Sequence, residues 1–207
     1  MNLRKAFALL LAGALPVVPA GCRSYEPFDD GITSVKAGSD VVNITKMGGG
    51  IDVDDAPHGA NLTTMGGGIH LGNVAVFAKV KTMGGGITIG TANGPIKATT
   101  MGGDIKVREV GSSSEERDIE LTSKGGTIEL TVPRDFPMEV RITLAYTRTD
   151  RDYRIIQHAG LEVRETNTWD TSEGTPRKYI RAAGRVGSGL NRVTIKTING
   201  NVLLRQE

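Results

Sequence analysis

The densest group of side chains that could hold a metal ion lies in the segment 52–58. It contains Asp52, Asp54, Asp55 and His58, and carboxylate oxygens are the donors that a divalent cation such as Ca²⁺ prefers. A metal site built on a repeated unit would need the acids to recur, and they do not recur in the units that follow. We therefore interpret the segment as a solvated surface and expect neither a metal ion nor another cofactor.

Paired carboxylates would indicate a glycan-cleaving enzyme, a class that often uses stacked β-folds. Asp52 and Asp104 lie three copies of an 18-residue repeat apart. Stacked strands are about 4.8 Å apart, so these carboxylates would be separated by about 14 Å. Glycosidase carboxylates are roughly 5 to 9.5 Å apart. We therefore expect a protein without catalytic activity, with a glycan-active lyase or hydrolase as the alternative.

Four methionines share the 18-residue spacing, namely Met47, Met65, Met83 and Met101. Thioether sulfur is a soft donor, and a ladder of such sulfurs could bind Cu(I). Methionine is also a polarizable filler of irregular apolar space. We favour the second interpretation, with the side chains packed beneath neighbouring glycines, and expect no metal binding.

Aromatic and basic residues are interleaved in the segment 146–169. Tyr146, Arg148, Arg151, Tyr153 and Trp169 form a candidate binding surface for sugar rings or for a protein. The same aromatic residues could instead cover the end of a stacked fold, because exposed terminal strands must be protected. Both interpretations stay open.

Composition excludes several classes of site. The chain has 207 residues with one cysteine, which rules out an intrachain disulfide and a CxxC site. Its three histidines are too far apart for a local imidazole-rich metal motif. The 28 glycines, beside four tyrosines, four phenylalanines and one tryptophan, predict a fold in which glycine has a structural role.

The N-terminal residues 1–21 have the pattern of a secretory signal. Two basic residues precede a short apolar stretch that ends in small residues, and it is too short to span a membrane. The ending Ala20-Gly21-Cys22 resembles a bacterial lipobox, which implies lipidation of Cys22. Residues 22–33 then form a short tether. Arg23 after the cysteine, rather than aspartate, favours the outer membrane or cell surface by the same resemblance.

Cleavage of the signal also changes the charge balance. The chain has 25 basic and 23 acidic residues, and the signal removes Arg4 and Lys5, which leaves 23 of each. A neutral mature protein lacks the positive field that nucleic acid requires. We expect a membrane attachment through the lipid and an envelope protein or glycan as partner, but no nucleic acid.

The 18-residue repeat decides the fold. Met-Gly-Gly-Gly-Ile begins at residues 47, 65 and 83, Met-Gly-Gly-Asp-Ile begins at 101, and weaker copies occur at 123–128 and 197–202. Apolar residues two positions apart flank each glycine corner, which is the period of a β-strand. The repeat predicts an all-β protein: a single-chain parallel β-solenoid, or β-helix, with 18-residue coils over residues 34–207.

The corners of this solenoid are expected at Met47, Gly49, Met65, Gly67, Met83, Gly85, Met101 and Gly103. Glycine there would supply positive φ and let stacked backbones approach closely. Thr64, Thr82 and Thr100 would form a ladder whose hydroxyls bond to corner backbone groups. From about residue 118 the coils become wider and less regular, and Val193–Leu204 would close the stack.

Two other architectures fit less well. A calcium β-roll needs aspartates in successive turns, and only Asp52 and Asp104 approach such positions. A left-handed hexapeptide helix needs an aliphatic residue at every sixth position, where Pro57, Ala75 and Asn93 stand instead. The solenoid with two strands per repeat remains the economical solution.

Several of these segments together resemble a known family. They are the lipoprotein signal, the Thr-x-x-Gly-x-Ile corners, the strand 128–133 with its terminal proline, and the closing segment Gly187–Val202. The combination resembles the bacterial adhesin domain, a β-strand-repeat family of unknown function, over residues 34–205. The resemblance implies a right-handed solenoid and assigns no catalytic residues. The sequence thus predicts a lipid-anchored, non-catalytic envelope protein with an adhesin-like binding role or a structural role.

Overall fold

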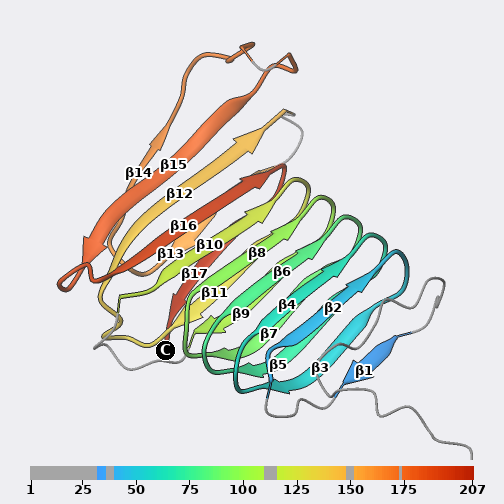
Figure 1. The fold of residues 1–207 in the computed structure, drawn as a ribbon. Helices are drawn as coiled ribbons and strands as arrows, with labels where there is room; N and C mark the ends of the chain where they lie inside the picture. The colour runs from blue at the N-terminus through green and yellow to red at the C-terminus, as the bar shows by residue number, and fades with distance from the viewer. Residues whose placement is uncertain (1–31, 36–39, 110–115, 148–151, 173) are drawn as a thin grey trace, which may run out of the picture.

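The protein is an all-β stack of short coils. The computed structural model describes residues 32–35, 40–109, 116–147, 152–172 and 174–207. These residues form seventeen strands and no helix. The strands make two sheets that face each other across the core (Figure 1). Because neighbouring strands are mostly parallel, the fold is the predicted parallel β-solenoid.

Sheet A has eight strands and is parallel throughout. Its spatial order is β1 (Thr33–Val35), β3 (Ile51–Ala56), β5 (Ile69–Val74), β7 (Ile87–Ala92), β9 (Ile105–Glu109), β11 (Ile128–Val132), β17 (Val202–Gln206) and β13 (Ile155–Gln157). Each coil of the regular part contributes one strand to this sheet and one to the opposite sheet.

Sheet B has nine strands. Its spatial order is β14 (Glu162–Glu165), β15 (Lys178–Val186), β12 (Met138–Tyr146), β16 (Asn191–Ile198), β10 (Asp118–Ser123), β8 (Ile96–Thr100), β6 (Ala78–Thr82), β4 (Ala60–Thr64) and β2 (Val42–Lys46). Only β15 is antiparallel to its neighbours, β12 and β14. This exception marks the irregular end of the stack.

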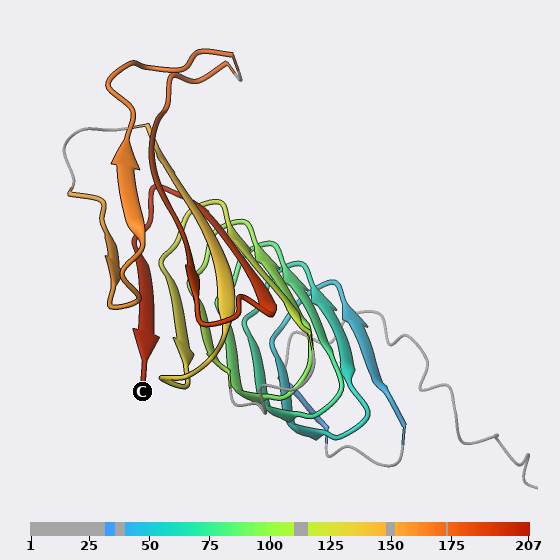
Figure 2. The same ribbon diagram turned by 90° about the vertical axis from the view of Figure 1, so that its left-hand side faces the viewer.

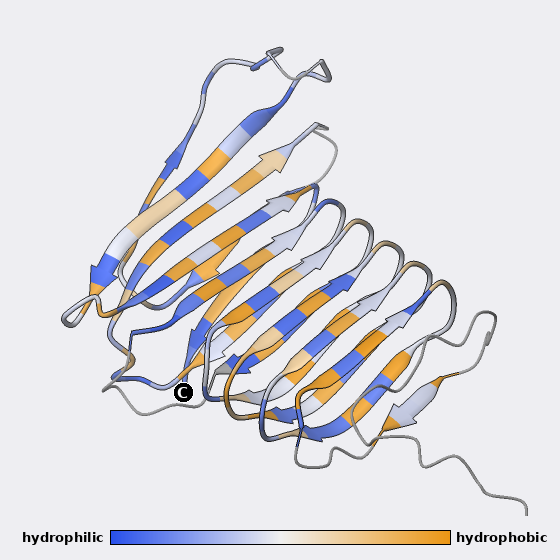
Figure 3. Ribbon diagram, viewed as in Figure 1, coloured by the Kyte–Doolittle hydropathy of each residue, from blue (hydrophilic) through white to orange (hydrophobic). Residues whose placement is uncertain are grey.

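Alternation of apolar and polar residues explains why these segments form strands. In β6 the side chains of Ala78, Val80 and Thr82 are buried, whereas the two lysines between them are exposed. The same banding runs along the other strands (Figure 3). One face of each sheet therefore contributes to a single core between the sheets, and the other face contacts water.

The register keeps equivalent residues of successive coils side by side. Ile51 pairs with Ile69, and Ile69 pairs with Ile87. On the wet face the Asn61 amide donates to the Asn43 side-chain oxygen at 2.9 Å, from a residue 18 positions away. Each column of the repeat is therefore a physical column on the molecule.

Glycine allows the corners to stack. A Cβ on Gly67 would lie 2.1 Å from the carbonyl oxygen of Gly49, and one on Gly103 would lie 2.2 Å from that of Gly85. Close approach is thus the reason for glycine at this column. The expected positive φ is found only at Gly49 (70°) among these corner glycines, so that part of the prediction is wrong for the others.

The predicted hydroxyl ladder is present next to the glycines. Thr64 donates to the carbonyl oxygen of Gly49 at 2.9 Å, and Thr82 donates to that of Gly67 at 2.7 Å. The same bond recurs from Thr100, Ser123 and Thr197 to Gly85, Gly103 and Gly126. The buried hydroxyls satisfy carbonyl groups that the bend leaves without a strand partner.

The C-terminal coil does not close the stack, contrary to the sequence prediction. Strand β16 lies between β10 and β12, and β17 lies between β11 and β13. The last coil along the chain is therefore an interior coil. The apolar pattern of Val193 and Ile195 matches that of β10 on one side and β12 on the other, so the pattern alone could not distinguish an inner place from an end.

The end of sheet B opposite β2 carries a projection. Strands β12 and β15 are nine residues long and extend past the regular coils, and β14 pairs along the outer edge of β15 (Figure 2). We call residues 162–186 the terminal flap. It lies at the opposite end of the stack from β1.

Candidate functional site

An aromatic cluster lies where the terminal flap meets β12. Tyr146 stacks on Tyr153 with ring centroids 5.8 Å apart and contacts Trp169 edge to face at 6.0 Å. The ammonium of Lys178 lies 5.4 Å from the centroid of the Trp169 ring. These contacts join the end of β12 and the nearby Tyr153 to the flap, beside the strand pairing of β12 with β15.

The members of the cluster differ in accessibility. Tyr146 is buried, Tyr153 is half-buried and Trp169 is 40% exposed. The tyrosine pair is thus mostly covered, while part of the Trp169 side chain stays accessible to solvent. Arg148 and Arg151, which the sequence analysis placed on the same surface, lie outside the described residues.

A short hydrogen bond fixes the ionisation of the buried tyrosine. The Tyr146 hydroxyl donates to Glu165 at 2.5 Å. This bond, together with burial and the negative charge of Glu165, raises the pKa of Tyr146 to about 12. The phenol therefore stays neutral and links the end of β12 to β14 across the intervening strand β15.

A polar hollow of about 550 Å³ lies on the flap. It is lined by Glu162, Arg164, Glu165, Thr166, Arg181 and Ala183. The Arg164 guanidinium donates to Glu162 at 2.7 Å, and the Arg181 guanidinium lies 4.7 Å from the centroid of the Tyr179 ring. Donors, acceptors and aromatic faces close together are suited to binding a polar, hydroxyl-rich ligand.

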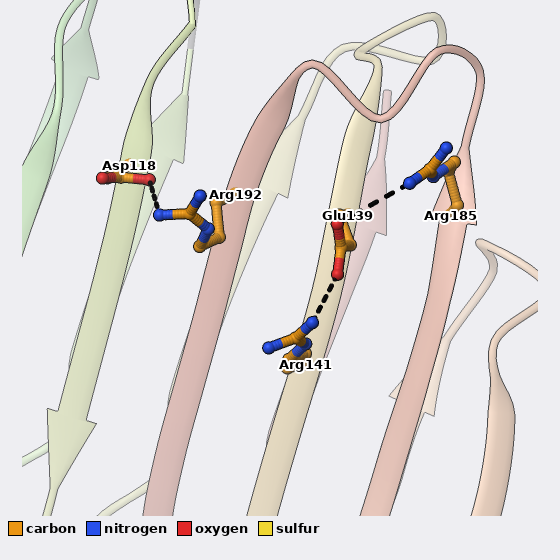
Figure 4. Close-up of polar contacts among 5 residues, drawn as sticks. All are labelled: Asp118, Glu139, Arg141, Arg185 and Arg192. Atoms are coloured by element: carbon orange, nitrogen blue, oxygen red, sulfur yellow. Dashed lines mark hydrogen bonds and ion pairs between the residues drawn. The ribbon is translucent and has the colours of Figure 1, made fainter.

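Ion pairs on the wet face join β10 to β16 and β12 to the flap. Arg192 of β16 contacts Asp118 of β10 at 3.3 Å, and Glu139 of β12 contacts Arg141 at 2.7 Å and Arg185 of β15 at 3.9 Å (Figure 4). These side chains are on the wet face, so each pair adds little stability. Two of the pairs match charges between neighbouring strands that are distant in sequence, β10 with β16 and β12 with β15.

The acidic segment is not assembled into a metal site. Asp52 contacts the Nδ1 atom of His70 at 2.8 Å, and Asp55 accepts a hydrogen bond from Asn73 at 2.7 Å. Both partners come from the next coil, 18 residues further along the chain, where the sequence prediction sought a recurring acid rather than a histidine or an amide. No group of three or more histidine, cysteine or acidic side chains among the described residues could hold a metal ion.

The hollows on the wet faces bring few acids together. Asp118 and Glu120 line one hollow, where Glu120 pairs with Lys97 at 2.8 Å and Asp118 pairs with Arg192. Asp52 and Asp104 line none of the hollows described among the resolved coils. The acids of this hollow are therefore engaged by bases of neighbouring strands.

The methionines are not buried filler, and that expectation is wrong. The side chains of Met47, Met65, Met83 and Met101 are between 41% and 56% exposed. A signal for this existed in the sequence, because the strand alternation that turns Thr64 inward turns the next residue outward. Strand alternation therefore continues through the methionine, one residue further into the corner than predicted.

The lipidation site lies outside the described residues, as do the signal and most of the tether, 22–31. Within the part of the chain that the structure describes, no helix is long and apolar enough to cross a membrane. No family model, curated protein or solved structure matches the chain. The adhesin-like resemblance therefore remains a hypothesis based on the motifs alone.

Proposed function

We propose that the protein is a lipid-anchored, non-catalytic binding protein of the cell envelope that presents its terminal flap to a partner. The observation that carries the proposal is the position of the flap at the opposite end of the stack from β1. A chain anchored at Cys22 would hold its N-terminal coils near the membrane. The solenoid would then act as a rigid spacer that keeps the flap away from it.

The flap supplies groups suited to recognising a glycan or a polar protein surface. Trp169 presents an accessible ring on the face that carries Tyr146, and Arg164, Arg181 and Glu162 surround the polar hollow on the opposite face of the sheet. Aromatic faces pack against the apolar faces of sugars, while charged side chains bond to hydroxyl groups. An envelope glycan that packs on the Trp169 ring is the ligand we propose, and an envelope protein is the other partner to be tested.

The anchor is tested by intact-mass spectrometry of protein extracted from membranes. We expect a chain that begins at Cys22 and carries acyl groups, and a Cys22→Ser variant that is released from the membrane fraction. A chain that begins elsewhere, or an unmodified Cys22, would contradict the anchor.

The binding role is tested with immobilised protein, purified envelope polysaccharide and solubilised envelope proteins. Trp169→Ala should abolish retention of the ligand, whereas Val76→Ala, which removes an exposed apolar side chain from a regular coil, should not. Equal retention by both variants, or none by the parent, would contradict the proposal. Shortening of the polysaccharide by the parent would favour the alternative, a glycan-active enzyme.

A further inference from the structure

A column of exposed thioethers runs along one edge of the regular coils. We call it the methionine ladder, and it consists of Met47, Met65, Met83 and Met101. The residues before them pair strand to strand, Lys46 with Thr64 and Thr64 with Thr82. Successive methionines are therefore one strand spacing apart, about 4.8 Å.

The constancy of this column has no structural cause in the fold. The column of Gly67, Gly85 and Gly103 is constant because a Cβ there would lie too close to backbone atoms. The column of Thr64, Thr82 and Thr100 is constant because each hydroxyl donates to a carbonyl oxygen. Other exposed columns vary from coil to coil: one contains, in order, Asp52, His70, Thr88 and Lys106. Exposed methionine repeated on four coils is thus a feature that packing does not require.

An apolar contact stripe would not need methionine either. Leucine, isoleucine or valine would present similar apolar area, and the chain exposes Ile32, Val76 and Val163 elsewhere. The chain has six methionines, of which Met1 begins it and Met138 is fully buried. The remaining four all stand in the ladder, and the property that distinguishes them from other apolar residues is a soft sulfur donor.

We infer that the methionine ladder binds a soft monovalent metal ion, Cu(I) or its analogue Ag(I), through thioether sulfurs of adjacent coils. Three rotatable bonds let each side chain swing toward its neighbour, and the spacing of about 4.8 Å brings the sulfurs of two or three coils within reach of one ion. Thioether is neutral, so binding displaces no proton.

The surroundings leave the ladder accessible to an ion. The residues that follow the methionines are glycines without side chains; a Cβ on Gly66 or Gly102 would meet no atom closer than 3.6 Å, and one on Gly84 would lie 3.0 Å from the carbonyl oxygen of Gly66. At the C-terminal end the column continues with exposed Lys124, whose backbone N–H donates to the carbonyl oxygen of Thr100. Lys124 carries a positive charge and has no sulfur, so the run of thioether donors ends there. The proposed site is therefore confined to the four regular coils.

The test titrates the full-length chain carrying Cys22→Ser, which removes its one thiol, with Ag(I) and with Cu(I) kept reduced by ascorbate. We expect at least one ion per chain. In spectra of ¹³C-methyl-labelled methionine, the ladder resonances should shift while that of Met138 stays in place. The affinity should be the same at about pH 5 and pH 8, because a histidine ligand would lose affinity on protonation in this range.

Two variants separate the ladder from sulfur in general. Met65→Leu with Met83→Leu keeps volume and apolarity but leaves Met47 and Met101 three coils apart, about 14 Å, too far to share an ion. We expect its affinity for either ion to fall at least about tenfold. Met138→Leu, which removes one sulfur from the core, should bind as the parent does.

Two results would overturn the inference. One is a parent chain that takes up no stoichiometric Ag(I) or Cu(I). The other is a double leucine variant that binds as tightly as the parent while its thermal unfolding is unchanged. If the double variant instead unfolded, the methyl shifts of the intact parent would still decide the matter.

Discussion

The Asn191 side-chain amide donates to the carbonyl oxygen of Pro137 at 2.7 Å, and its oxygen accepts from the backbone N–H of Arg117 at 3.1 Å. Asn191 is fully buried at the start of β16. One side chain of the C-terminal coil thus satisfies backbone groups in the segments that lead into the coils on both sides.

Asn191→Ala should therefore lower the free energy of unfolding by about 1 to 3 kcal/mol, because it leaves the buried Arg117 N–H without its acceptor. Asn43→Ala is the matched control, since Asn43 bonds on the exposed face. Its effect should stay within about 0.5 kcal/mol. Urea unfolding followed by circular dichroism measures both effects. If the two variants unfold at the same urea concentration, the hydrogen bonds of Asn191 do not hold the neighbouring coils together.

The interior position of the C-terminal coil predicts an asymmetric response to truncation. Deleting residues 187–207 removes β16 and β17 and breaks two interfaces in each sheet, whereas deleting residues 32–46 removes β1 and β2 and breaks one in each. In a stacked fold, stability is approximately a sum of neighbour interfaces. We expect the C-terminal deletion to abolish cooperative unfolding and the N-terminal deletion to preserve it. The opposite outcome would mean that the last coil lies at an end.

Two adjacent glycines of one corner should differ sharply when given a methyl group. Gly67→Ala places Cβ 2.1 Å from a backbone oxygen that cannot rotate away, while Gly66→Ala meets nothing closer than 3.8 Å. The first should reach or exceed the upper end of the about 1 to 3 kcal/mol typical of overpacking. The second should change stability by about 0.5 kcal/mol or less. Thermal melts of the two variants provide the comparison.

The regular coils could be predicted from sequence because their constraints are local and repeated. Apolar residues two apart around each glycine corner specify which side faces the core, and the constant spacing specifies the register, as in the pairing of Leu62 with Val80. A one-residue slip would turn every core side chain outward. Periodicity therefore sufficed for the fold class and for the hydroxyl ladder at Thr64, Thr82 and Thr100.

The candidate sites depended only in part on contacts that periodicity encodes. The partner of Asp52 is His70, one repeat further along the chain, whereas the partner of Tyr146 is Glu165 of the flap, outside the repeat. The flap forms through antiparallel pairing of β15 with β12, in a region where the repeat is lost. Long-range pairing of this kind depends on side-chain fit and leaves no regular spacing in the sequence.

The hydrogen bond of Glu165 to Tyr146 makes the stability of the flap depend on pH in the alkaline range. The pKa of Tyr146 is raised from 10.0 to about 12 in the folded protein, chiefly by its hydrogen bond to Glu165, then by burial and by the charge of that residue. A pKa raised by folding means that the folded state favours the neutral phenol. The resulting stability is fully present below pH 10, and it is lost as the pH rises from 10 to about 12.

Ultraviolet titration of phenolate should show one tyrosine ionising near pH 12, and Glu165→Gln should lower that pKa because it removes the anionic acceptor. Glu162→Gln is the matched control, since Glu162 pairs with Arg164 in the same hollow. If both variants ionise as the parent does, Glu165 does not hold the proton on Tyr146, and the flap owes its place to the pairing of β15 with β12 and to the aromatic contacts.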